Sequence, residues 1–144
     1  MGVVFAFTEK YDIDSFECFC TMEKIYDEET DTYLPVKVLW DTGSNLSCIS
    51  PAIAEKLNLK SIGSCKVNNV YDEDMVKVYS TCICINDTQR FMENVFISDQ
   101  ITGNCDVILG LNIISLCDFT TSCDDKYVYL SVRYPSQGKI DYTK

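Results

Sequence analysis

Histidine is absent from this chain of 144 residues. Ser-His-Asp and Cys-His catalysis in their usual forms need an imidazole as the general base, so the sequence excludes both. The common catalytic zinc sites need histidine ligands and are excluded for the same reason. Among the common hydrolytic chemistries, mainly carboxylate chemistry remains.

Basic residues are few: 12 Lys and Arg stand against 22 Asp and Glu, which gives a net charge of −10. Nucleic acid is therefore not an expected partner, because phosphate binding needs clustered Lys and Arg. The apolar runs are too short to span a membrane, and residues 1–7 lack the basic start of a signal peptide. The expected location is the cytoplasm, with no membrane partner.

The nine cysteines are an odd number with no accompanying secretion signal. One residue separates Cys18 from Cys20, and likewise Cys82 from Cys84, so in a strand both thiols of each pair lie on one face. A zinc site with four cysteine ligands and a redox pair are two functional interpretations. Because the Cys-x-x-Cys spacing is missing, the sequence favours a third, in which reduced cysteines serve as small buried hydrophobes and no metal is bound.

The chain has the length of a single domain, contains no linker, and is predominantly β in pattern. Strands are expected over residues 2–7, 16–25, 33–40, 76–85, 91–97 and 126–134. Ser50 and Pro51 indicate the start of a helix, as N-cap and first helical residue, and this helix is expected to stop near Asn58. Residues 135–144 are polar and expected to be loose.

Asp41-Thr42-Gly43-Ser44 follows a hydrophobic run that predicts a buried strand. A carboxylate at the end of such a strand is costly unless hydrogen bonds compensate it. Gly43 permits a turn that other residues make with difficulty, and the hydroxyls on either side of it can hold a carboxylate in place. The motif predicts one aspartate presented rigidly at the floor of a cleft.

A second apolar strand ends in Val107-Ile108-Leu109-Gly110 and runs directly into a short apolar segment of helical character. Taken alone, this is an ordinary core strand and turn. Between the two motifs, residues 65–85 predict a projecting hairpin with the acidic turn Tyr71-Asp72-Glu73-Asp74.

In this order the motifs resemble the retropepsin family of aspartic proteases, and most of all its bacterial branch, in which Trp-Asp-Thr-Gly and Asp-Val-Ile-Leu-Gly are typical. The resemblance covers residues 35–134 and implies an all-β fold, a closed half-pepsin barrel with one or two short helices. It divides a single domain, 1–144, into an N-terminal β extension (1–34), the core (35–134) and the polar tail (135–144). The extension could add a strand to a dimer sheet or cover a sheet edge.

The resemblance implies a role for each residue of the first motif. Asp41 would be the catalytic aspartate. Thr42 would join the two active-site loops across a dimer. Gly43 would donate its N–H to the carboxylate, and Ser44 would hydrogen-bond the outer carboxylate oxygen.

Ile108, Leu109 and Gly110 would pack beneath the Asp41 loop, and the hairpin would be a flap that closes over substrate. Tyr71, Asp72, Glu73 and Asp74 would form the tip of the flap, where Tyr71 is either a gate or an exposed aromatic residue. The tip departs from the family pattern because no glycine lies between residues 65 and 82, whereas retroviral flaps are rich in glycine. An acidic tip would favour basic substrates.

Aspartic proteolysis uses two carboxylates that share one proton, since like charges about 3 Å apart cannot both ionise. This chain has one Asp-Thr-Gly, so catalysis would require a symmetric homodimer in which two Asp41 side chains meet. No metal or organic cofactor is needed. The implied function is an aspartic endopeptidase acting on a peptide or protein substrate. The alternatives are a catalytically silent dimer for peptide binding or assembly, and a structural domain in which Asp41 is a turn residue.

Overall fold

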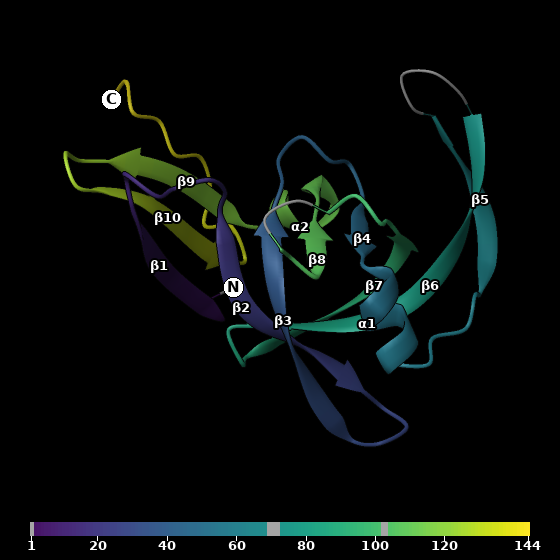
Figure 1. The fold of residues 1–144 in the computed structure, drawn as a ribbon. Coiled ribbons are helices and arrows are strands. Elements are labelled where there is room, and N and C mark those ends of the chain that lie inside the picture. The colour runs from purple at the N-terminus through teal and green to yellow at the C-terminus, as the bar shows by residue number, and fades with distance from the viewer. Residues whose placement is uncertain (1, 69–72, 102–103) are drawn as a thin grey trace.

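A computed structural model describes residues 2–68, 73–101 and 104–144 of the chain (Figure 1). Its elements, in order, are β1 (Phe5–Asp12), β2 (Cys20–Asp27), β3 (Thr32–Trp40), β4 (Ser47–Ile49), α1 (Pro51–Lys56), β5 (Gly63–Asn68), β6 (Glu73–Ile85), β7 (Gln89–Ile97), β8 (Val107–Leu109), α2 (Leu111–Ile114), β9 (Asp118–Cys123) and β10 (Tyr127–Tyr134). Neither helix of these described ranges has the length or apolar character needed to cross a lipid bilayer.

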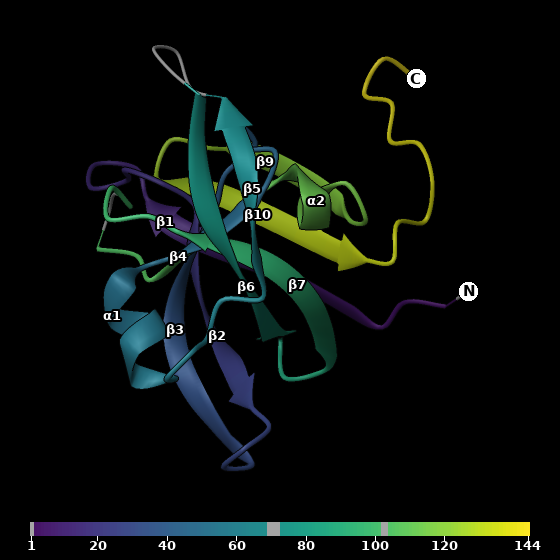
Figure 2. The ribbon, with the colours of Figure 1, turned by 90° about the vertical axis from the view of Figure 1, so that its right-hand side faces the viewer.

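Six of the strands close into a barrel. They are hydrogen-bonded in the order β2, β3, β8, β4, β7, β6, and residues 24–26 of β2 pair in turn with residues 82–84 of β6. β5 pairs with the other half of β6, and this hairpin stands out from the barrel, with α1 and α2 on opposite flanks in Figure 2. The prediction of an all-β closed barrel with one or two short helices is confirmed.

Branched apolar side chains fill the barrel because successive residues of a strand point to opposite faces. In β3, Val38 and Trp40 point inward and are 0% and 3% exposed. β8 runs parallel to β3, with Val107 beside Val38 and Leu109 beside Trp40. Val107 and Leu109, the first and last residues of β8, are both fully buried. Because the two strands are parallel and in register, the residues that follow them lie side by side.

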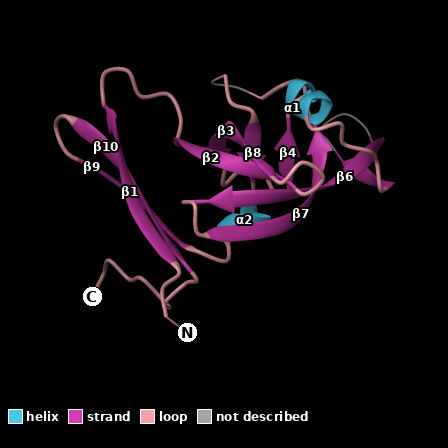
Figure 3. Cartoon of the chain, turned by 90° about the horizontal axis from the view of Figure 1, so that it is seen from below, coloured by secondary structure: helices cyan, strands magenta, loops and turns pink. Residues whose placement is uncertain are grey.

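A separate sheet of three strands, in the order β1-β10-β9, stands beside the barrel (Figure 3). β1 pairs with β10 along its whole length, from Phe5 opposite Tyr134 to Asp12 opposite Tyr127. Phe5, Leu130 and Val132 from this sheet are buried in the same core as the barrel interior. Residues 5–12 of the N-terminal extension are therefore part of the chain's own three-stranded sheet, whereas β2, which also lies within residues 1–34, belongs to the barrel.

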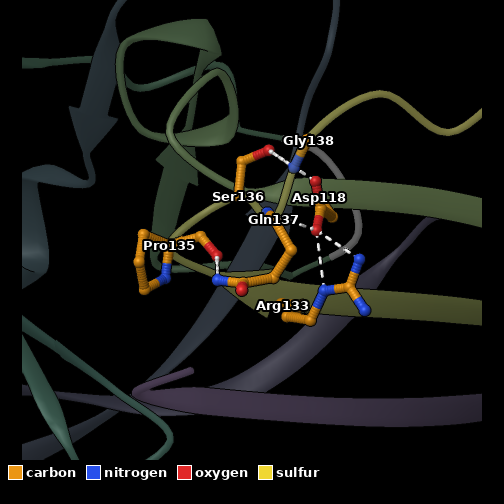
Figure 4. A network of polar contacts seen from close by, with 6 residues as sticks. All are labelled: Asp118, Arg133, Pro135, Ser136, Gln137 and Gly138. Atoms are coloured by element: carbon orange, nitrogen blue, oxygen red, sulfur yellow. Dashed lines mark hydrogen bonds and ion pairs between the residues drawn. The ribbon is translucent and has the colours of Figure 1, made fainter. Parts of the chain in front are cut away.

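Asp118, the first residue of β9, fixes the start of the C-terminal tail (Figure 4). Its Oδ2 accepts from Arg133 Nε at 2.7 Å and from the Gln137 N–H at 3.0 Å, and its Oδ1 accepts from Ser136 Oγ at 2.6 Å. These hydrogen bonds lower the pKa of Asp118 to about 2, and the bond from Ser136 has the largest effect. Residues 136 and 137 are thus held against the sheet, although the polar sequence predicts a loose tail.

Most of the expected elements are present with shifted ends. Ser50 caps α1 by accepting from the Ile53 N–H at 3.3 Å, as the sequence predicts. The first strand begins at Phe5 and continues to Asp12, whereas residues 2–7 are expected from the sequence. β9 is not predicted by the sequence, because four of its six residues, Asp118, Thr120, Thr121 and Ser122, are polar.

Candidate active site

Asp41 follows the last residue of β3, where the backbone is tied to the parallel strand. The Asp41 N–H donates to the Leu109 carbonyl oxygen at 2.9 Å. The Gly43 N–H donates to Asp41 Oδ1 at 2.8 Å, which is the contact that the resemblance implies for this glycine. A turn from Asp41 O to the Ser44 N–H, at 3.3 Å, closes the loop. The carboxylate is partly exposed and is oriented by its own loop.

Gly110 lies directly against the loop that carries Asp41. A Cβ atom at this position would be 2.4 Å from the Leu46 carbonyl oxygen and 2.6 Å from that of Ser44, both of them backbone atoms. The next residue, Leu111, donates its N–H to the same Ser44 oxygen at 2.7 Å. The absence of a side chain at Gly110 therefore allows the two chain segments to make contact.

A buried polar network, which the sequence does not reveal, supports this contact from below. Ser47 is fully buried, accepts from the Gly110 N–H at 3.2 Å and donates to Asn112 Oδ1 at 3.0 Å. The Asn112 amide then donates to Glu93 Oε2 on β7 at 3.0 Å. No motif marks Ser47, Asn112 and Glu93, because they come from three separate elements, β4, α2 and β7, that the fold brings together.

The remaining residues of the two motifs lie around this contact. Thr42 is exposed. Ser44 Oγ donates to the Leu46 carbonyl oxygen at 2.7 Å, so in the single chain its hydroxyl braces the loop rather than the carboxylate. Leu109 is fully buried beside Trp40, whereas Ile108, on the opposite face of β8, is half-buried.

The predicted flap tip falls partly outside the described residues, where Tyr71 and Asp72 lie. Glu73 and Asp74 are the first residues of β6 and pair with Asn68 and Val67 of β5. The hairpin that they belong to extends from the same side of the barrel as the loop after β3 (Figure 1). The predicted order of the chain, with a hairpin between the two motifs, is therefore present.

A second carboxylate, not predicted from the sequence, is buried behind Trp40. Trp40 Nε1 donates to Thr21 Oγ1 at 2.8 Å, and this hydroxyl donates to Glu23 Oε2 at 2.5 Å. Glu23 is 8% exposed, and its Oε1 accepts from the Asn86 N–H at 2.8 Å. Burial raises the pKa of Glu23, although these hydrogen bonds oppose the rise.

Replacing Glu23 by Gln should flatten the pH dependence of stability. A carboxyl group whose pKa is raised by folding stabilises the protein below its ordinary pKa, and this contribution is lost as the pH rises through the raised value. The wild type should therefore lose unfolding free energy as the pH rises above the ordinary glutamate pKa of 4.5, and Glu23→Gln should lose less. Urea unfolding at several pH values measures this. The exposed Glu29→Gln variant should follow the wild type, and parallel curves for all three would contradict the prediction.

The fold is similar to those of two solved proteases. The EIAV protease complexed with the inhibitor HBY-793 is 19% identical over 71% of this chain and 89% of its own, with a TM-score of 0.53. A retropepsin-like aspartic protease from Rickettsia conorii is 12% identical over 93% of this chain and 97% of its own, with a TM-score of 0.54. No protein-family model and no curated protein matches the sequence.

These likenesses define the class of the fold: the chain has the retropepsin-like, half-pepsin architecture that its two motifs predict. Asp41 stands after the barrel strand β3, and Gly110 follows the strand parallel to it.

Proposed function

We propose that this protein is an aspartic endopeptidase that hydrolyses peptide bonds with water activated between two Asp41 carboxylates of a symmetric homodimer. The observation that carries the proposal is that Asp41 is held in place by contacts to its side chain and to its loop. The side chain is oriented by the Gly43 N–H, and its loop is pressed against Gly110 with no room for a Cβ atom. A rigidly held, partly exposed carboxylate suits a group that must meet an identical group at a fixed distance.

The chemistry divides the two carboxylates into an acid and a base. With one proton shared between them, the ionised Asp41 takes a proton from water, and the protonated Asp41 polarises the scissile carbonyl. In the proposed dimer, Thr42 joins the two active-site loops across the interface. Ser44 forms a hydrogen bond to the Asp41 carboxylate.

Exposed apolar side chains beside the loop support association of two chains. Leu46 is 42% exposed and Leu111 is 37% exposed. The backbone of Leu46 lies against Gly110, and Leu111 is the residue after Gly110. Apolar side chains that gather in this way are typical of a surface that another chain covers. A dimer formed around Asp41 would remove part of this area from water.

Sedimentation and active-site titration test the proposal together. The chain should sediment as a dimer at the concentrations at which it cleaves peptides, and its specific activity should fall on dilution as the dimer dissociates. A statine-type transition-state mimic should abolish activity at about one molecule per two chains, because a single substrate spans both carboxylates. A monomer that keeps full activity would remove the mechanism.

The hairpin favours a second candidate, a catalytically silent dimer that binds peptides. Its segment 65–82 contains no glycine, and its tip is acidic. Such a protein would be a dimer that cleaves nothing and is not titrated by the statine-type compound. The same two measurements therefore separate the candidates.

Charge and cysteine content bear on the substrate and the compartment. A net charge of −10 and an acidic flap tip support basic peptide segments as substrates. An odd number of cysteines cannot be fully paired within one chain, which supports the reducing cytoplasm as the location.

A further inference from the structure

Three cysteines, far apart in sequence, bring their sulfur atoms together outside the Asp41 site. Cys18 Sγ lies 3.2 Å from Cys20 Sγ, which lies 3.0 Å from Cys105 Sγ. All three sulfur atoms lie within 4.8 Å of one another. Cys18 belongs to the loop before β2, Cys20 begins β2, and Cys105 precedes β8. The sequence marks the first two as a pair, and the fold adds the third.

The backbone around each thiol is fixed by β3. Cys20 is opposite Leu39 in the β2–β3 ladder, and the Trp40 N–H donates to the carbonyl oxygen of Phe19, between the first two cysteines, at 2.9 Å. On the other side, Asp106 N–H donates to Lys37 O at 2.8 Å, and Lys37 N–H donates to Asp106 Oδ2 at 2.8 Å. The three thiols are therefore held in place by strands that the barrel already requires.

The three thiols are reached from solvent through a surface pocket, and the positively charged Lys37 lies in the same pocket. A surface pocket is lined by Cys18, Cys20 and Lys37, whereas Cys105 is 6% exposed at the inner side. Burial raises the pKa of each of the three thiols, and the positive charge of Lys37 opposes this rise in part. An ion that displaces the thiol protons would offset that cost of burial.

We propose that Cys18, Cys20 and Cys105 bind one soft divalent cation, Zn²⁺, with water from the pocket as the fourth ligand. Tetrahedral zinc with bonds of about 2.3 Å to sulfur places the sulfur atoms about 3.8 Å apart, so the thiols need to separate by less than about 1 Å. Binding releases three protons and leaves three thiolates and one Zn²⁺ with a net charge of −1, which the Lys37 ammonium group balances. The ion would join β2 to the segment before β8. β2 and β8 are the two strands on either side of β3, the strand that Asp41 follows.

A disulfide is the competing use of these thiols. It would join two sulfur atoms and leave the third beside them, and it would need an oxidant. Three converging thiols beside the Lys37 side chain match a metal site with three cysteine ligands more closely than they match a disulfide, since all three thiols then have the same role.

Cobalt binding tests the site in the reduced, metal-free chain of 144 residues. Co²⁺ should bind at one ion per chain with thiolate-to-metal charge-transfer absorption, and Zn²⁺ should displace it. Cys18→Ser, Cys20→Ser and Cys105→Ser should each weaken binding more than the roughly 10- to 100-fold that loss of an outer-shell partner causes. Cys123→Ser, at an exposed position in β9, should bind Co²⁺ like the wild type.

Two results would overturn the proposal. One is a Co²⁺ spectrum that the three cluster variants leave unchanged, which would assign the absorption to other cysteines. The other is a wild-type chain that binds no Co²⁺ but forms a disulfide within the cluster under mild oxidation, which would assign the thiols to redox chemistry. Cys18 is half-buried in a loop, so Cys18→Ser should fold and decides the test even if Cys105→Ser does not. The measurement is independent of peptidase activity.

Discussion

Replacing Asp41 by Asn should abolish peptide-bond hydrolysis while leaving the chain folded and dimeric. Asn is the same size, and its side-chain oxygen can still accept from the Gly43 N–H that orients Asp41 at 2.8 Å. It cannot exchange a proton with water, so the rate should fall on the order of 10³-fold or more. The measurement is the cleavage rate of a peptide library, with sedimentation and urea unfolding as checks on the fold.

The matched control is Asp31→Asn, at the Asp-Thr pair in the turn between β2 and β3. Asp31 is exposed and accepts from Tyr26 there, and it has a positive φ that Asn also adopts readily. This variant loses the same charge and should keep full activity. Residual cleavage by Asp41→Asn at a rate near that of Asp31→Asn would show that Asp41 is not the catalytic group.

Mixing wild-type and Asp41→Asn chains tests the shared site directly. If one active site needs Asp41 from both chains, activity should follow the square of the wild-type fraction, because mixed dimers are inactive. At equal amounts and full exchange, about one quarter of the dimers are wild-type homodimers. Activity that instead falls in proportion to the wild-type fraction would mean that each chain catalyses alone. Exchange is verified beforehand with chains of two different masses.

The second large effect is expected at Gly110. Gly110→Ala forces a Cβ atom to within 2.4 Å of the Leu46 carbonyl oxygen and 2.6 Å of that of Ser44, and neither backbone atom can move without moving the loop. We expect a loss of about 1–3 kcal/mol of unfolding free energy. Activity should fall about 100-fold in the chains that remain folded, because Asp41 is displaced.

Gly63→Ala is the control for the stability measurement. Gly63 begins β5, and a Cβ atom there meets nothing within 4 Å. This variant should match or exceed the wild type by up to about 1 kcal/mol, since Ala loses less conformational freedom than Gly on folding. Equal urea midpoints for Gly110→Ala and Gly63→Ala would contradict the proposed close contact.

The sequence predicts those parts of the fold that are encoded locally. The strand into Gly110 is a continuous apolar run, the strand into Asp41 is apolar except for Lys37 over residues 36–40, and the cap at Ser50 is a two-residue signal. β9 has no such signal, because it is a largely polar edge strand whose formation depends on β10. The extent of β1 likewise follows from its pairing with β10, which no local pattern encodes.

The same distinction applies to the site. Asp41, Gly43 and Gly110 belong to motifs, so their positions could be predicted, although the closeness of Gly110 to Leu46 could not. Ser47 and Glu23 could not be predicted, since their partners come from other strands. Cys105 lies beside Cys18 and Cys20 because β8 and β2 both pair with β3, which no local sequence pattern encodes.

The pairing of β1 with β10 has a consequence during biosynthesis. β1 is synthesised before the strands of the barrel, yet its partner is more than 100 residues further along the chain. At roughly 5–20 residues per second, the first strand waits for on the order of ten seconds before it can pair. Until then its backbone groups form an open edge, so this sheet is completed only after the barrel strands β2 to β8 have been made.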